Sequence, residues 1–441
     1  MLPRGAPAGE LEIIDTGNSR GGGDARALLF SVLDSLRSRF LLAAGLAVAA
    51  ALLITALFSG VTRRAEKRGI DAEAIWKSRT GVDLAALPRL YPAHADSEEA
   101  RALDVLLQPI DLHLGAPSAD RNPSGARRSD GRAMRDLRDT LRAAIRSTTT
   151  EPVALLPSVV SSIERSAGTL DAVADYVATH HDIHWLEDHG PRANRSALAV
   201  DDHLTLHRLL VGRAFLALSR GDTTTAVRML RTSQQLNRPL EERRELLSQF
   251  AAVGVERLQL ALLRRGGSAL AVVPGESTDR IRERYLAAMS SEAVRLLTNA
   301  RQGAFATDVN DPPERLFLLI AGPKIELLAS EAVTQSAIDV AEIRGALDGC
   351  AELGRDRRAR RGVHSHGFES LNAAEAWRRF VLLELDRAIT AAVLTGRASS
   401  PCPSVVLTVR EEGANRIVEA KGLPPESDSV IGVPSVVTSR R

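Results

Sequence analysis

The stretch LEERRELLSQFAAVGVERLQLALLRR, residues 240–265, determines the fold class of this chain. Its apolar residues recur at spacings of three and four, which is the period of one face of an α-helix. They are Leu247, Phe250, Ala251, Val255, Leu258 and Leu262. The spacing predicts an amphipathic helix that buries one apolar stripe.

Segments of the same kind recur along most of the chain, and aromatic residues, which favour strands, make up only 3% of it. We expect further helices near residues 97–114, 132–147, 153–166, 169–181, 197–219, 222–237, 277–302, 313–349 and 370–396. Helices of this length joined by short turns pack as antiparallel hairpins. Only residues 404–411 and 416–421 alternate as strands do, and they predict one small β-hairpin against the last helix.

Residues 40–61, FLLAAGLAVAAALLITALFSGV, form an apolar run without a charge. As a helix this run is roughly 33 Å long, enough for the ~30 Å hydrocarbon core of a bilayer. The basic stretch RRAEKR follows it in place of a small-residue cleavage site, which argues against a signal peptide. The sequence therefore predicts a single transmembrane helix.

The orientation of this span follows less directly from the flanking charges. Lys and Arg occupy four positions before it (20, 26, 37 and 39) and six after it (63, 64, 67, 68, 77 and 79). That local count favours a cytoplasmic C-terminal side, whereas export of an arginine-bearing N-terminal tail is unfavourable and large C-terminal domains cross largely regardless of charge. We expect the N-terminus inside and the bulk of the chain outside the cytoplasm.

Net charge and cysteine content restrict the remaining classes. A formal charge of +2 gives no electrostatic basis for binding nucleic acid. The basic run at residues 355–361 is expected to be solvated loop, with anionic lipid as the alternative ligand. The two cysteines, Cys350 and Cys402, are too few for a four-cysteine zinc site; they form either one disulfide or two free thiols.

Residues 211–239, VGRAFLALSRGDTTTAVRMLRTSQQLNRP, carry the features of a helical hairpin. A glycine, an aromatic residue, a Gly-Asp turn, an alanine and a closing proline follow one another as Gly212, Phe215, Gly221, Asp222, Ala226 and Pro239. The segment resembles a degenerate tetratricopeptide repeat. It departs from that family in two extra turn residues and in Ser233, where a small apolar residue is usual, and no second copy follows. More broadly, the layout resembles bacterial membrane-anchored helical proteins, which implies architecture and no reaction.

The chemistry-bearing residues gather in THHDIHWLEDH (179–189) and DDHLTLH (201–207). On helices, His180 and His184 would share one face, as would His203 and His207, and paired imidazoles of this kind build metal sites in helix bundles.

Two observations oppose a metal site. The glutamates of metalloprotease and di-iron motifs are absent, and His207 shares its face with apolar residues, as a core histidine would. His181 and Asp182 resemble the His-Asp pair of HD-type metal phosphohydrolases, but no further ligands can be assigned.

The sequence therefore predicts an all-α protein of tetratricopeptide-like, α-solenoid-like hairpins after one transmembrane helix, with a small C-terminal β-hairpin. The expected segments are a disordered tail (1–24), a juxtamembrane amphipathic helix (25–39), the span (40–61), a linker with the first helices (62–131), the hairpin domain (132–398), and the β-hairpin with a loose tail (399–441). We expect a scaffold or adaptor in the bacterial inner membrane, with its bulk periplasmic, that binds a protein partner on its helical surface without catalysis or cofactor. The alternative is an HD-phosphohydrolase-like, metal-dependent hydrolase that uses His180, His184, His203 and His207 to hold a divalent metal.

Overall fold

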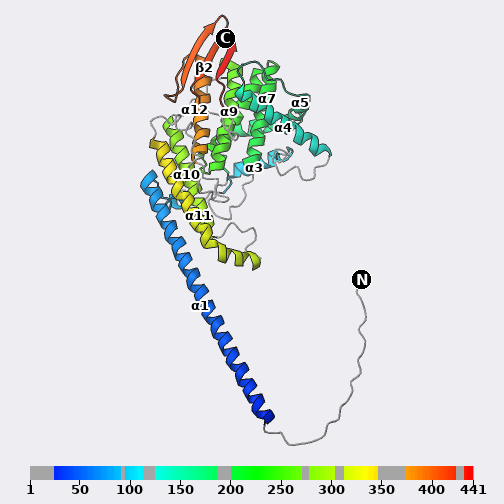
Figure 1. Cartoon of the computed structure of the whole chain (residues 1–441). Helices are drawn as coiled ribbons and strands as arrows, with labels where there is room; N and C mark the ends of the chain where they lie inside the picture. Colours follow the sequence, from blue (N-terminus) through cyan, green and yellow to red (C-terminus); the bar gives the residue numbers. More distant parts are fainter. Residues whose placement is uncertain are drawn as a thin grey trace, which may run out of the picture. The chain divides into compact units, whose positions relative to one another are not determined.

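A computed structural model of the chain describes residues 24–90, 95–110, 112, 125–185, 200–270, 278–302, 312–345, 373–423 and 432–440 (Figure 1). The described part is mostly helical with one small antiparallel sheet, as the sequence predicts. The chain divides into two compact units, Met1–Arg63 and Arg64–Arg441. The predicted disordered tail (except Asp24), the basic run 355–361 and Cys350 lie outside the described residues.

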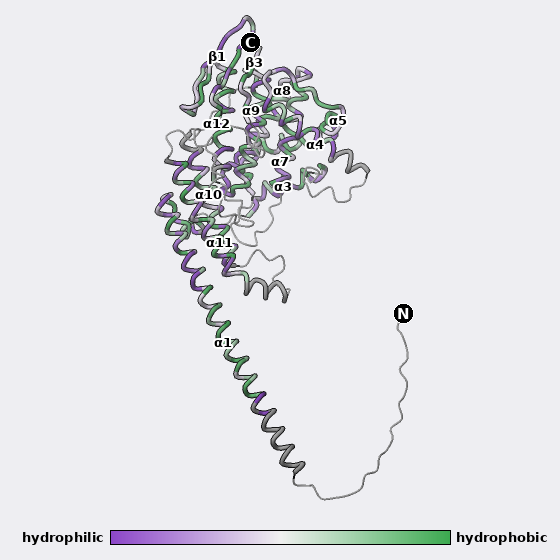
Figure 2. Tube along the Cα trace, in the orientation of Figure 1, coloured by the Kyte–Doolittle hydropathy of each residue, from purple (hydrophilic) through white to green (hydrophobic). Residues whose placement is uncertain are grey.

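Helix α1 (Asp24–Thr80) contains the apolar run. The predicted juxtamembrane helix and span are therefore parts of one helix. Residues 25–61 contain no proline, and their two glycines, Gly45 and Gly60, do not interrupt the helix. Figure 2 shows the middle of α1 as hydrophobic. The segment Arg39–Thr80 is long and apolar enough to cross a membrane, and none of its most apolar window is buried.

The second unit begins inside α1. Residues 64–80 continue the helix into this unit, where Ala72 and Trp76 belong to the hydrophobic core. Trp76 is fully buried and donates its Nε1 hydrogen to Ser290 Oγ at 3.2 Å. Glu73 pairs with Arg301 at 2.7 Å between Oε1 and Nη1. Ala72 and Trp76, one turn apart, share the inward face, so an extension of the anchor helix belongs to the folded body.

The helices of this body pack around one continuous hydrophobic core. They are α2 (Leu87–Leu90), α3 (Glu98–Leu107), α4 (Gly125–Arg146), α5 (Pro157–Arg165), α6 (Ala167–Thr179), α7 (Val200–Ser219), α8 (Thr223–Glu242), α9 (Leu246–Gly266), the 3₁₀ turn η3 (Gly267–Leu270), α10 (Thr278–Gln302), α11 (Pro312–Gly345) and α12 (Ala373–Thr395). The Gly-Asp turn between α7 and α8 forms as predicted: Gly221 has φ +76°, and Asp222 caps α8 by accepting from Thr225 N at 3.0 Å.

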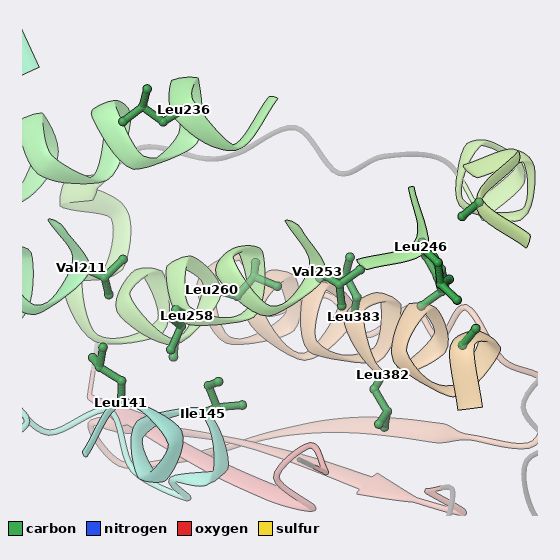
Figure 3. Close-up of a cluster of buried hydrophobic side chains, with 14 of the residues drawn as sticks. Leu141, Ile145, Val211, Leu236, Leu246, Val253, Leu258, Leu260, Leu382 and Leu383 are labelled. Carbon is green, nitrogen blue, oxygen red and sulfur yellow. The ribbon is translucent and has the colours of Figure 1, made fainter. Parts of the chain in front are cut away.

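Helix α9 lies at the centre of the body, and the prediction that it buries a single stripe is wrong. It contacts α7, α8, α12 and α4, so residues on all sides of it are buried. Leu247, expected on the stripe, is 63% exposed, whereas its neighbour Leu246 is 5% exposed. Figure 3 shows the surrounding side chains, which come from α4 (Leu141, Ile145), α7 (Val211), α8 (Leu236), α9 (Val253, Leu258, Leu260) and α12 (Leu382, Leu383).

The break between α8 and α9 falls three residues later than the proline predicted. Pro239 lies inside α8, which continues to Glu242. The side chain of Gln249 explains this end, because its Nε2 donates to the carbonyl oxygens of Leu240 (3.3 Å), Glu241 (2.8 Å) and Arg243. The last carbonyls of a helix lack partners within it, and one amide from α9 satisfies them here.

A three-stranded antiparallel sheet packs on α12 in order β1 (Val406–Glu412), β2 (Asn415–Lys421) and β3 (Val436–Arg440) (Figure 1). The first two strands are the predicted hairpin. The tail after them is not loose throughout, because Val436–Arg440 pairs with β2 and also bonds to residues 148 and 150. Arg416 of β2 caps α12 by donating Nη1 to the carbonyl oxygen of Val393 at 2.7 Å.

Candidate functional site

The histidines that the sequence singles out fall into an exposed pair and a buried pair. His180 and His184 are exposed and do not share a helical face, because α6 ends at Thr179 and residues 180–185 are not helical. His180 closes α6: its ring stacks on Tyr176 at a 3.9 Å centroid distance, and its Nδ1 lies 2.9 Å from the Tyr176 carbonyl oxygen. The expected helical pairing of His180 with His184 is therefore wrong.

The segment after His180 is extended, and its side chains alternate between core and solvent. Ile183 and Trp185 are buried, whereas His184 between them points outward. Backbone bonds fix the segment to the start of α3: Ser97 N donates to the His184 carbonyl oxygen at 3.0 Å, and Ser97 Oγ also caps α3. His184 is thus held by its backbone, with its imidazole in solvent.

His203 and His207 lie one turn apart on α7, and both are fully buried. The ring of His203 meets Trp185 edge-on at a centroid distance of 4.1 Å, and neither of its ring nitrogens has a hydrogen-bond partner. His207 Nδ1 lies 2.9 Å from Ser233 Oγ on α8, and its Nε2 has no hydrogen-bond partner. Of the four histidines, only these two enter the same buried environment.

Ser233 links three helices. Its Oγ accepts a hydrogen bond from Gln259 Nε2 of α9 at 2.9 Å and contacts His207 Nδ1 of α7. A hydroxyl oxygen can accept two hydrogen bonds or accept one and donate one, so the tautomer of His207 sets the direction of the Ser233–His207 bond. The serine that departs from the repeat pattern is therefore the hydrogen-bonding group that joins α7, α8 and α9.

The buried imidazoles are held neutral. Burial lowers the pKa of His207 from 6.5 to about 3. Burial, His207 and the guanidinium of Arg243 together lower the pKa of His203 well below 6.5. A charged imidazole in this environment would lose its hydration without gaining an acceptor, so both rings remain uncharged near neutral pH.

The arrangement gives no support to the alternative hypothesis of a metal centre, which stays untested. Across the described residues, no group of three or more His, Cys, Asp and Glu side chains is placed to hold a metal ion. His181 and Asp182, the pair that resembles HD-type hydrolases, are both exposed. The second half of the motif, residues 186–189, lies outside the described residues.

Sequence reasoning missed a buried ion network between α9 and α12. Asp386 is fully buried; its Oδ2 lies 2.5 Å from Arg257 Nε and its Oδ1 lies 3.1 Å from Arg264 Nη1. Arg264 also donates to Thr390 Oγ1 and to the Ile145 carbonyl oxygen, each at 3.1 Å. Arg257 and Arg264 are seven residues apart and so share one face of α9, which was the available signal.

Cys402 is buried and disulfide-bonded. Its expected partner, Cys350, lies outside the described residues, so the Cys350–Cys402 pairing stays a prediction.

Comparison with known proteins assigns no family. No protein-family model matches this chain, and no curated protein or solved structure is significantly similar to it.

Proposed function

We propose that this chain is a single-pass, membrane-anchored helical scaffold that presents its body to a protein partner without catalysing a reaction. The observation that carries the proposal is the contrast within α1. Ten large apolar side chains between Phe40 and Val61 are exposed to an extent that water would penalise, whereas Trp76 on the same helix is fully buried. A bilayer around the first part and a folded body around the second account for both.

The body is proposed to lie outside the cytoplasm of a bacterial cell, anchored in the inner membrane. The bonded state of Cys402 supports this location, because disulfides persist in oxidising compartments and are rare in the cytosol. The arginines that precede the span support the same orientation, since their export is unfavourable.

The hairpin of α7 and α8 is the proposed partner-binding surface. Its inner faces are occupied by the core, while Arg231 and Arg238 on α8 are exposed. Stacked helical hairpins commonly use such faces to bind proteins. The resemblance of residues 211–239 to a tetratricopeptide repeat motivates the same assignment.

Charge placed in the span tests the anchor. Leu46 and Leu52 are 64% and 66% exposed, so their replacement disturbs no packing within the chain. An arginine near the centre of a span costs about 3 kcal/mol on insertion scales. We expect the L46R/L52R variant to leave the membrane fraction on alkaline carbonate extraction, while L46I/L52I remains. Equal retention of both variants would contradict the anchor.

Site-specific crosslinking in intact cells tests the partner surface. A photoreactive residue at Arg231 or Arg238 is expected to give a discrete crosslinked protein, identified by mass spectrometry. The matched control is the same residue at Arg397, which is exposed beyond the end of α12. Crosslinks that are identical at all three positions, or absent from both α8 positions, would contradict a partner on this face.

A further inference from the structure

Helices α4 and α7 pack on each other, and together they carry three arginines near this contact. Arg138 and Arg142 lie one turn apart on α4, and Arg208 lies one turn before Gly212 on α7. Gly212 marks the contact between the two helices, because a Cβ atom there would lie 3.0 Å from Leu137 Cδ1 of α4. Arg208 is one turn along α7 from this contact, and the charges of Arg138 and Arg142 act on it.

These side chains are poorly neutralised by their surroundings. Arg138 Nε contacts Asp139 Oδ1 at 3.0 Å, but that carboxylate is exposed. In the part of the chain that the structure describes, neither Arg142 nor Arg208 forms a hydrogen bond or an ion pair, although Arg208 is half-buried.

The charges around Arg208 agree with this imbalance. Burial, with Arg138 and Arg142, lowers the pKa of Arg208 to about 10, against a smaller opposite effect of Asp201 and Asp139. Like charges repel one another, and the half-buried guanidinium of Arg208 loses hydration without gaining a protein acceptor, which destabilises the fold.

The chemistry of the cluster selects its ligand. A guanidinium offers five donors in a planar fork that suits carboxylate or phosphate oxygens. One carboxylate is satisfied by a single arginine fork, whereas a phosphate group has enough oxygens and charge to accept from several arginines at once. We propose that Arg138, Arg142 and Arg208 form a binding site for a phosphate group, either free in solution or carried by a lipid headgroup. This proposal is independent of the scaffold function.

Thermal unfolding of the full chain in a neutral, phosphate-free detergent tests the site. Titration with inorganic phosphate is expected to raise Tm by on the order of 1–3 °C beyond chloride of equal ionic strength. The R142Q and R208Q variants should lose this rise, and R208Q should have a higher Tm than the wild type without phosphate. R142Q is informative even if R208Q folds poorly, because Arg142 is exposed. The control R397Q, at an exposed arginine beyond the end of α12, should keep the rise.

Reconstitution distinguishes the two sources. If a lipid supplies the phosphate, nanodiscs with phosphatidylglycerol raise Tm relative to phosphatidylcholine alone, R142Q abolishes that difference, and added phosphate gives nothing further. If free phosphate is the ligand, it raises Tm equally in both lipids. The proposal is overturned if neither source stabilises the wild type, or if R142Q and R397Q respond alike to both.

Discussion

Acidification should destabilise this protein through its buried histidines. His207 is neutral in the folded chain, with a pKa of about 3, and regains its ordinary pKa of about 6.5 on unfolding. Because the folded pKa is the lower one, the unfolded state takes up the proton first as the pH falls. Stability is therefore complete above pH 6.5 and is lost progressively from there towards pH 3.

The size of this loss follows from the two pKa values. Between pH 8 and pH 5, His207 alone should reduce the free energy of unfolding by about 2 kcal/mol. His203 contributes in the same direction, since burial, His207 and Arg243 all lower its pKa. Asp104 acts oppositely, because burial and the charges of Asp96 and Asp202 raise its pKa, but its contribution is common to wild type and variants.

Urea unfolding of the full chain in neutral detergent, followed by tryptophan fluorescence, measures the effect. The H207Q variant removes the titrating group, so its loss between pH 8 and pH 5 should be smaller than that of the wild type by about 2 kcal/mol. H180Q is the control. Because His180 is exposed, the free energy of unfolding of this variant should fall between pH 8 and pH 5 by as much as that of the wild type. An equal pH-dependent loss in H207Q and the wild type would refute the assignment of a neutral, buried His207.

Three further outcomes are expected. The D386N variant should lower the free energy of unfolding by about 3–5 kcal/mol, because it leaves two buried arginines without their carboxylate; D175N, at an exposed aspartate, should change it by less than about 1 kcal/mol in chemical denaturation. Non-reducing peptide mapping should recover a peptide joined through Cys350 and Cys402 that disappears on reduction, and two alkylated thiols in the unreduced protein would contradict it. Metal analysis of the purified chain should find no stoichiometric metal and chelator no change in Tm; a bound metal whose removal lowers Tm would instead favour the hydrolase.

The elements that the sequence predicts correctly are those that depend on the pattern of neighbouring residues. The positions of α7, α10 and α12 follow from helical spacing and caps, and the β1–β2 hairpin follows from alternation around a tight turn. The end of α8 was misplaced because a proline near a helix end is a local signal, whereas Gln249, which completes that end, comes from the next helix.

Contacts between segments that are distant in the sequence could not be predicted from such local patterns. Trp185 covers His203 only after the chain has turned back on itself, and β3 acquires its pairing from β2 across residues that carry no strand pattern. Asp386 lies more than a hundred residues from Arg257, so neither residue's neighbours indicate the ion pair. Ser233 was visible only as a departure from a repeat pattern, and its role depends on His207 and Gln259.

Among the residues that the structure describes, two helices are apolar and long enough to cross a membrane, and buried charge distinguishes them. In α9 (Leu246–Gly266), 83% of the most apolar window is buried, whereas in α1 none is. Helix α9 carries Arg257 and Arg264, which a bilayer would penalise by several kcal/mol, but both form ion pairs with Asp386 inside the body. The apolar run of α1 contains no charged residue, and its leucines are exposed rather than packed against other parts of the described chain. A hydropathy test treats the two helices alike, while the location of ionic partners assigns α9 to the protein core and leaves α1 as the candidate for the membrane.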